Sequence, residues 1–205
     1  MIKNIYLGKF IVFEGLDGSG QSTQASLLKD FLMKKGYGVV LTKEPTRDSN
    51  AGEKIRSVLD KKLKITLREL QELFAEDRKE HLENLIFPAL KKGEVVVSDR
   101  YFFSSFAYGA GSGLDLEWLI KINDGFLLPD LTFILKVSPE ICLERIDRRG
   151  NARTLFEEKE KLTKVWQVYK ILQNRIKNVY IIDGERPIEE VFEEVKKIVH
   201  SKLNL

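Results

Sequence analysis

The sequence is poor in cysteine, proline and long apolar runs. Its single cysteine, Cys142, cannot form an internal disulfide or a cysteine-cluster metal site, and its place in an apolar helical pattern predicts a core residue. No apolar run reaches the roughly 18 residues needed to span a bilayer, and residues 1–9 lack the apolar segment of a signal peptide. With five prolines in 205 residues, the composition is typical of a soluble globular protein. We expect a cytoplasmic location without membrane contact.

The sequence also lacks an excess of charge of either sign. Its 34 Lys and Arg residues and 31 Asp and Glu residues are intermixed along the chain, and the formal net charge is +3. This balance gives no general field that would attract nucleic acid or a membrane surface, so we expect neither partner. No internal repeat divides the chain, and its length predicts one α/β domain over residues 1–205.

The chain is organised around residues 10–23, FIVFEGLDGSGQST. An apolar run, Phe10–Phe13, enters a glycine-rich turn, and apolar residues at helical spacing leave it. The stretch matches the P-loop pattern G-x-x-x-x-G-K-[ST] except at one position. Glycines let the backbone turn its N–H groups inward, so the turn and the helix N-terminus form a cradle for phosphate. The predicted cradle consists of Gly15, Leu16, Asp17, Gly18, Ser19, Gly20, Gln21, Ser22 and Thr23.

The exceptional position is Gln21, which stands where the pattern has a phosphate-binding lysine. Its amide can donate to a phosphate oxygen but brings no charge. Ser22 keeps the hydroxyl that P-loop proteins place on a Mg²⁺ ion bridging the phosphates. The alternative interpretation is that the glycines merely link a strand to a helix, and Gln21 is its main support.

Two further segments carry candidate ligand-binding residues. A short strand at Val39–Thr42 ends in a polar loop, residues 43–49, at the strand end where open α/β sheets bind ligands. A capping box at residues 66–69 then opens a helix that runs to the region of Pro88. Phe74 and Arg78 share one face of this helix. Phe74 is a stacking ring or a core residue, and Arg78 is a binding group or a solvated charge.

A third predicted strand, Val95–Val97, leads into Asp99 and Arg100. P-loop enzymes use a buried strand that ends in Asp to deliver a carboxylate to Mg²⁺. The neighbouring Arg100 can form a bidentate pair with a phosphate. The alternative role of Asp99 is to cap the following helix.

Four arginines in nine residues follow a helix that begins at Ser138-Pro139. They are Arg145, Arg148, Arg149 and Arg153. The pattern predicts a lid at approximately residues 146–156 that closes over phosphates. Cations favoured by the dipole at a solvated helix end explain Arg148 and Arg149 equally well.

The other segments alternate between helix and strand. Helices are predicted near 102–109, 116–123, 156–176 and from Pro187, and strands at 131–137 and 179–182. This alternation predicts an α/β fold of three layers, a mostly five-stranded parallel sheet with helices on both faces, as in P-loop NTPases.

Taken in order, these segments resemble the thymidylate kinase family of P-loop nucleoside monophosphate kinases. The resemblance covers nearly the whole chain. It rests on GLDGSGQST at 15–23, KEPTR at 43–47, LFAEDR at 73–78, DRYFFSSFAY at 99–108, LLPDLTFIL at 127–135 and the arginine-rich stretch. The chain departs from the family at Gln21 and after Glu44-Pro45, where many bacterial members have Gly-Gly-Thr.

The resemblance implies a site for each of two nucleotides. In it Phe74 stacks on thymine, Arg78 reaches the carbonyl edge of the base, and Tyr108 packs beside the deoxyribose. Arg145 lies against the adenine of ATP, and because Gly18 stands where some members carry an arginine, the catalytic arginine comes from the lid. The implied dTMP-binding residues are Asp17, Glu44, Arg47, Phe74, Arg78, Arg100, Ser104 and Tyr108; the Mg²⁺ ligands are Ser22 and Asp99; the candidate catalytic residues are Arg148, Arg149 and Arg153. The resemblance also implies a homodimer.

We therefore expect transfer of the γ-phosphoryl group of ATP to dTMP with Mg²⁺, slowed by the loss of charge at Gln21. An acceptor that is already a phosphate needs no general base. One alternative is a deoxynucleoside kinase, in which Glu44 would take a proton from a 5′-hydroxyl. The other is a nucleotide-binding protein that has lost catalysis, which only Gln21 supports.

Overall fold

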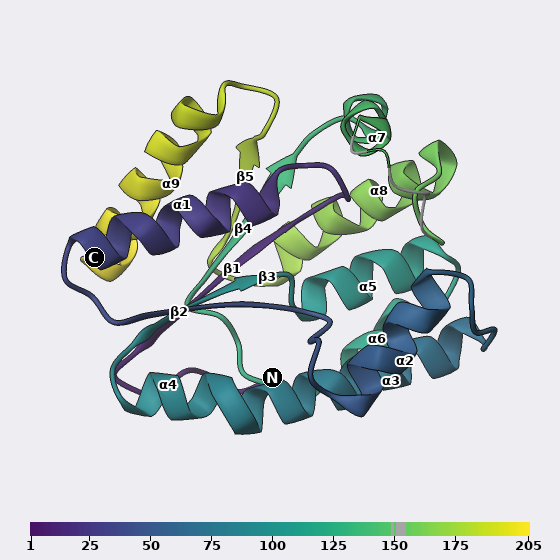
Figure 1. Cartoon of the computed structure of the whole chain (residues 1–205), viewed down its shortest axis with the longest axis horizontal. Helices are drawn as coiled ribbons and strands as arrows, with labels where there is room; N and C mark the ends of the chain where they lie inside the picture. Colours follow the sequence, from purple (N-terminus) through teal and green to yellow (C-terminus); the bar gives the residue numbers. More distant parts are fainter. Residues whose placement is uncertain (149, 151–154) are drawn as a thin grey trace.

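The structure is a computed structural model of the chain, and it describes residues 1–148, 150 and 155–205. The described residues form a sheet of five parallel strands with helices on both faces (Figure 1), as the alternating sequence pattern predicts. The strands are β1 (Lys9–Gly15), β2 (Val39–Lys43), β3 (Val95–Asp99), β4 (Leu131–Lys136) and β5 (Val179–Asp183). The helical segments are α1 (Gln21–Lys34), α2 (Asn50–Leu59), α3 (Leu67–His81), η1 (Leu82–Ile86), α4 (Phe87–Lys91), α5 (Phe102–Gly111), α6 (Leu116–Ile122), α7 (Pro139–Asp147), α8 (Lys159–Arg175) and α9 (Ile188–Leu203).

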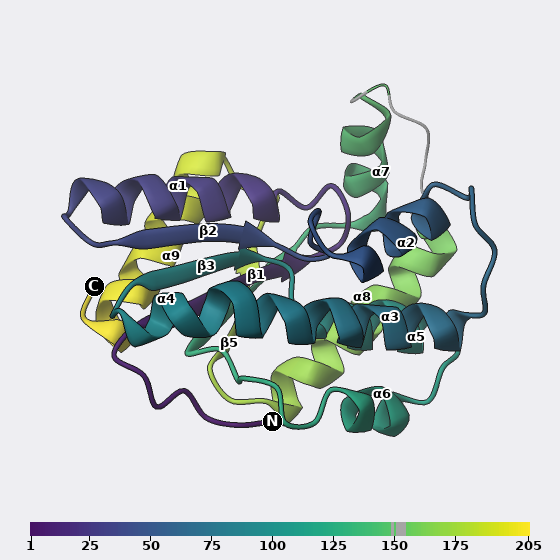
Figure 2. The ribbon, with the colours of Figure 1, turned by 60° about the horizontal axis from the view of Figure 1, so that its bottom comes forward.

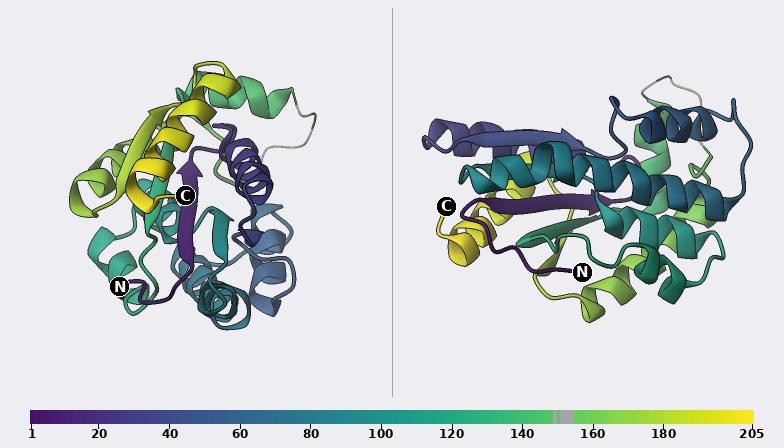
Figure 3. Two further views of the ribbon diagram at one scale, coloured as in Figure 1. Left: turned by 90° about the vertical axis from the view of Figure 1, so that its left-hand side faces the viewer. Right: turned by 90° about the horizontal axis from the view of Figure 1, so that it is seen from below.

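Alternate residues of the strands face the two helical layers. On β1, Ile11 and Phe13 pack in a core cluster with α1 and α9, whereas Phe10 and Val12 pack in a larger cluster with α3, α5 and α8. Figures 1 and 3 show α1 and α9 on one face of the sheet and the other long helices on the opposite face. Apolar residues on both faces explain why these strands read as continuous apolar runs in the sequence. Within the described residues, no helix is long and apolar enough to cross a membrane.

The strand order β2-β3-β1-β4-β5 brings several loops to one edge of the sheet. Asp99 of β3 lies in register with Phe13 of β1 on one side and with Lys43 of β2 on the other. Because parallel strands all end at the same edge, the P-loop, the end of β2 and the end of β3 lie together. Figure 2 shows α2 and α7 on the side of the molecule toward which the N-terminal end of α1 points.

The structure differs from the expected elements at three places. Helix α2 was not predicted, because its apolar stripe is short and Gly52 is a weak helix former. In the structure Ser49 caps this helix, since its Oγ accepts a hydrogen bond from Gly52 N at 2.8 Å. The helical path continues past Pro88 to Lys91, because the π-helical segment η1 joins α3 to α4 without a break. The long helix begins at Lys159 instead of Phe156, whose ring packs edge-on against Tyr108 with centroids 5.3 Å apart.

The cap of α3 allows a direct test, because α3 carries Phe74 and Arg78. Thr66 Oγ1 accepts from Glu69 N at 3.1 Å and completes a capping box. Thr66→Ala is expected to lower the free energy of unfolding by about 1 kcal/mol, measured by chemical denaturation. The control is Thr163→Ala, which removes an exposed hydroxyl from the interior of α8 and should change little. Equal losses in the two variants would contradict a capping role.

Candidate active site

The P-loop joins β1 to α1 and bends sharply at its glycines. Gly18 and Gly20 have φ values of +86° and +97°, and Gly20 is the N-cap residue of α1. A Cβ atom at Gly18 would lie 2.5 Å from the carbonyl oxygen of Cys142, so a side chain there would clash. The first turn of α1 has no side-chain cap, which leaves its N–H groups for an anion.

Ser22 and Asp99, the predicted metal ligands, lie together at the carboxyl edge of the sheet. Ser22 Oγ donates to Asp99 Oδ2 at 2.5 Å, and Lys43 Nζ donates to the same oxygen at 2.6 Å. The second carboxylate oxygen of Asp99 is buried and has no hydrogen-bond partner among the described residues. A hydroxyl and an unpartnered carboxylate oxygen are ligands that Mg²⁺ accepts, so this pair fits the predicted ion.

Arg100 is fixed beneath the P-loop. Its φ of +74° is uncommon for a residue other than glycine, and its backbone N–H donates to Phe13 O at 2.8 Å. The guanidinium Nη1 donates to Gly15 O at 3.0 Å and to Ser104 Oγ at 2.7 Å, and Nη2 donates to Asp17 Oδ1 at 2.8 Å. The predicted phosphate-binding arginine is therefore oriented by the P-loop itself.

Gln21 points into the protein, and 5% of the residue is exposed. In the amide orientation that satisfies its neighbours, Nε2 donates to Leu16 O at 3.1 Å and contacts the hydroxyl of Ser19. Its Oε1 then accepts from Arg100 Nη2 at 2.6 Å and from Arg100 Nε at 3.1 Å. The Gln21 amide, which the sequence suggests as a donor to a phosphate, thus donates to P-loop atoms instead.

A cavity of about 190 Å³, here named the aromatic cavity, brings most of the predicted dTMP residues together. Tyr108 Oη donates to Asp17 Oδ2 at 2.9 Å and accepts from Asp17 N at 2.9 Å, which joins the cavity wall to the P-loop. Phe74 is half-buried in α3 and lines the cavity, so it is not sealed within the core. The predicted residues that line it are Asp17, Glu44, Phe74, Arg78, Arg100, Ser104 and Tyr108.

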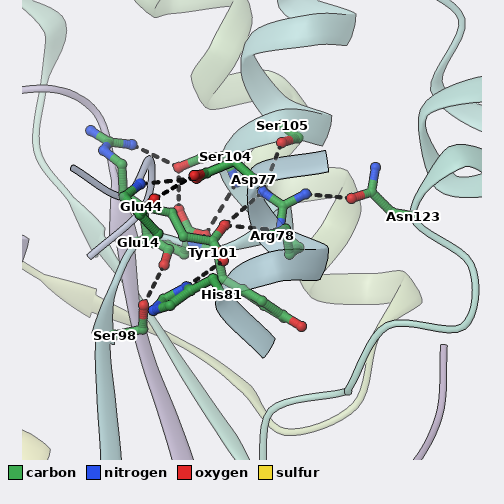
Figure 4. Close-up of polar contacts among 12 residues, drawn as sticks. Glu14, Glu44, Asp77, Arg78, His81, Ser98, Tyr101, Ser104, Ser105 and Asn123 are labelled. Atoms are coloured by element: carbon green, nitrogen blue, oxygen red, sulfur yellow. Dashed lines mark hydrogen bonds and ion pairs between the residues drawn. The ribbon is translucent and has the colours of Figure 1, made fainter. Parts of the chain in front are cut away.

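Arg78 lies at the centre of a buried polar network (Figure 4), so the interpretation of it as a solvated charge is wrong. Its Nε donates to Glu44 Oε2 at 2.9 Å, its Nη2 donates to Ser105 Oγ at 3.1 Å, and its Nη1 contacts Asn123 Oδ1. His81 Nδ1 lies 3.1 Å from the other carboxylate oxygen of Glu44. A charge that is 1% exposed requires such compensation.

The remaining predicted arginines lie elsewhere. Arg47 is exposed and lines a second, wider cavity of about 810 Å³, here named the β2 cavity, together with Ser22, Lys43 and Asp99. Arg145 donates to the carbonyl oxygens of Gly18 and Ser19, each at 3.4 Å, beside a third cavity behind the P-loop. The Arg148 side chain is 80% exposed, with Nη2 3.9 Å from Glu144 Oε2. Arg149 and Arg153 lie outside the described residues.

Sequence reasoning missed several residues that hold the site together. Glu14 Oε1 accepts from Tyr101 N at 2.9 Å, and Oε2 accepts from Ser104 Oγ at 2.6 Å and from Tyr169 Oη at 3.0 Å. A charged residue inside an apolar strand, FIVFEG, was the signal available for Glu14. No comparable pattern in the sequence marks Lys43, His81 and Asn123, because only their contacts in the folded protein distinguish them from surface residues.

A parallel sheet with a phosphate cradle between β1 and α1, and with a Ser–Asp pair beside it, defines the class of P-loop nucleotide-binding proteins. Comparisons with known proteins narrow the class. The family model for thymidylate kinase matches residues 13–195. A probable thymidylate kinase of Pyrococcus horikoshii is 42% identical over 202 residues, which cover 96% of this chain and 98% of that protein. A thymidylate kinase of Caldicellulosiruptor saccharolyticus is 42% identical, with the same shares covered. The chain belongs to the thymidylate kinase family.

The buried carboxyl of Glu14 predicts a pH dependence of stability. Burial raises its pKa from 4.5 to about 7, although Arg100 and the hydrogen bonds from Ser104, Tyr101 and Tyr169 oppose the shift. The unfolded chain loses this proton near pH 4.5, whereas the folded protein keeps it until about pH 7. The contribution of Glu14 to the free energy of unfolding is therefore fully present below pH 4.5 and is lost as the pH rises through about 7.

Glu14→Gln should remove this slope, which amounts to at most about 3 kcal/mol. The measurement is the free energy of unfolding from pH 4 to 8 for both proteins. Glu193→Gln, at an exposed carboxylate of α9, serves as the control and should follow the parent curve. Parallel curves for Glu14→Gln and the parent would contradict the assignment.

Proposed function

We propose that the protein transfers the γ-phosphoryl group of ATP to dTMP, giving dTDP and ADP. The observation that carries the proposal is the aromatic cavity, in which an aromatic ring, a buried arginine and a second arginine held by the P-loop line one space. Membership of the family supports the same reaction. This chemistry needs positioning and charge stabilisation more than covalent catalysis, and the described site offers both.

In the proposed complex the thymine base lies between Phe74 and the guanidinium edge of Arg78. Glu44 and Asn123 hold Arg78 in one orientation, so little side-chain entropy is lost when the base binds. Tyr108, tied to Asp17 by two hydrogen bonds, would lie beside the deoxyribose and oppose a 2′-hydroxyl. Ser104 joins this wall through its bond to Arg100.

The acceptor phosphate in this proposal is held by Arg100, with Arg47 approaching from the β2 cavity. The donor phosphates occupy the cradle at the N-terminus of α1, and Arg145 contributes to the adenine side. Ser22 and Asp99 would hold Mg²⁺, which when bound neutralises phosphate charge. Arg148, Arg149 and Arg153 remain candidates for a catalytic arginine that reaches the site from the lid.

Glu44 bears on the choice between a nucleotide and a nucleoside acceptor. Its two carboxylate oxygens are engaged by Arg78 and His81, at 2.8 and 3.1 Å, and the residue is 3% exposed. A carboxylate held by a buried arginine is poorly placed to take a proton from a 5′-hydroxyl. This arrangement supports a phosphate acceptor over a deoxynucleoside kinase.

We further propose a cytoplasmic homodimer, which the family resemblance supports. Analytical ultracentrifugation of the purified chain would measure its mass in solution. A monomer at micromolar concentration would contradict this assignment without affecting the proposed reaction.

An acceptor panel tests the reaction. We expect ADP release to be fastest with dTMP, slower with its ribonucleotide analogue and absent with thymidine, because Arg100 requires an acceptor phosphate and Tyr108 opposes a 2′-hydroxyl. A coupled ADP-release assay over these acceptors makes the measurement. Faster release with thymidine than with dTMP would assign the chain to the nucleoside kinases.

Phe74→Ala tests base stacking. A stacked base is worth about 1–3 kcal/mol on alanine substitution, so we expect KM for dTMP to rise about tenfold or more while KM for ATP stays nearly constant. Phe87→Ala is the matched control, since Phe87 is also half-buried but packs against Tyr6 away from the cavities. If Phe74→Ala lowers thermal stability as much as Phe87→Ala and leaves KM unchanged, Phe74 is a core residue only.

A further inference from the structure

The cradle of this chain lacks the charge that a P-loop lysine would supply. Gln21 is neutral, and its amide contacts Leu16, Ser19 and Arg100 instead of the opening of the cradle. A fixed positive charge near transferring phosphates acts strongly because the site is partly closed to water. Either turnover is slow, or another cation supplies this charge.

Lys43 is the side chain best placed to do so. It is the last residue of β2 and lies in register with Asp99, and its Nζ donates to Asp99 Oδ2 at 2.6 Å. Ser22, in the first turn of α1, donates to the same oxygen at 2.5 Å. The Lys43 ammonium and the hydroxyl of Ser22, a residue of the cradle, therefore share one carboxylate oxygen of Asp99 as their acceptor.

Lys43 also lies between the two cavities. It lines the β2 cavity with Ser22 and Asp99, and it lines the aromatic cavity with Asp17 and Arg100. Its side chain is 53% exposed, whereas that of Asp99 is 6% exposed, so the lysine end of the pair is open to solvent and accessible to a phosphate in either cavity. The flexible stem of lysine lets the ammonium move between such partners.

Arg78 and Arg100, the other described cations that line the aromatic cavity, are held by other groups. Arg100 is bound by Asp17, Ser104 and the carbonyl of Gly15, and Arg78 is bound by Glu44 and Asn123. Arg145 contacts P-loop carbonyl oxygens from behind. Among the residues that the structure describes, Lys43 is the one cation that lines both the aromatic and the β2 cavity.

We propose that the Lys43 ammonium takes the role of the missing P-loop lysine and contacts the phosphoryl group as it passes from donor to acceptor. The inference rests on the proposed function. The bond between the β–γ bridging oxygen and the γ-phosphorus breaks, and a bond forms between that phosphorus and an oxygen of the acceptor phosphate. Lys43 keeps its protons throughout and supplies charge alone.

Four variants test the proposal: Lys43→Gln, Lys43→Arg, Gln21→Lys combined with Lys43→Gln, and the control Lys62→Gln. Lys62 is exposed and pairs with Asp60 away from the cavities. We expect Lys43→Gln to lower kcat about 100-fold, as the loss of one electrostatic stabiliser does elsewhere, with KM for dTMP changed less than threefold. Lys43→Arg should keep kcat within about tenfold of the parent, because it keeps the charge. The double variant should regain at least about tenfold over Lys43→Gln, and Lys62→Gln should match the parent.

Binding provides a readout that does not depend on turnover. Isothermal titration of ATP in EDTA should give a Kd about tenfold weaker for Lys43→Gln than for the parent, while both melt at similar temperatures. A parent that phosphorylates no nucleoside monophosphate would overturn the proposed function and with it the transfer role of Lys43, whereas an active parent with an unchanged Kd for ATP in Lys43→Gln would overturn the inference alone. The proposal is overturned if Lys43→Gln keeps kcat within threefold of the parent, if its Kd for ATP is unchanged, or if neither Lys43→Arg nor the double variant recovers activity.

Discussion

The site depends first on the parallel pairing of β1 with β3. This pairing places Asp99 beside Phe13, and the next N–H along the chain, that of Arg100, donates to the carbonyl of Phe13. Because β1 runs directly into the P-loop, the same pairing brings Ser22 within hydrogen-bond distance of Asp99. A slip of one residue would turn every side chain of β3 to the opposite face. The valines of β3 are buried on both faces of the sheet, so the residues that such a slip would misplace are the polar ones at its end, Ser98 and Asp99.

The charged groups of the site compensate one another before any ligand binds. Arg100 is neutralised by Asp17, Arg78 by Glu44, and Asp99 by Lys43. Buried charges are expensive unless they are paired, so these contacts hold the side chains in fixed orientations. The pairs differ in exposure, because Arg78 and Glu44 are sealed whereas Lys43 is half open to solvent. The buried Arg78–Glu44 pair lines the aromatic cavity, and the Lys43 ammonium lies at the opening of both cavities as the proposal requires.

The sequence predicted the parts of the structure whose causes are local. The glycine spacing, the capping box at Thr66 and the valine run of β3 each act within a few residues, and the structure contains all three as expected. The amphipathic pattern gave no such guide to Arg78, because its burial depends on Glu44 and Asn123, which lie 34 and 45 residues away in the chain.

The orientation of Gln21 was hidden for the same reason. Its partner Arg100 comes from the end of β3, and the contact exists only because the sheet brings that end beneath the P-loop. The convergence of seven predicted residues on the aromatic cavity could be anticipated through the family motifs, whereas the position of Lys43 beside Asp99 follows from strand register alone.

The π-helical segment η1 has a consequence for how this chain can vary in length. The N–H of Phe87 donates to the carbonyl of Leu82, five residues earlier, so η1 holds one more residue than a regular helical turn. Deleting one residue there would restore the regular period and rotate α4 by about 100° relative to α3. Either Leu90 would leave the core or Arg78 would leave the cavity. A change of one residue in the length of η1 would therefore displace either the core or the wall of the cavity.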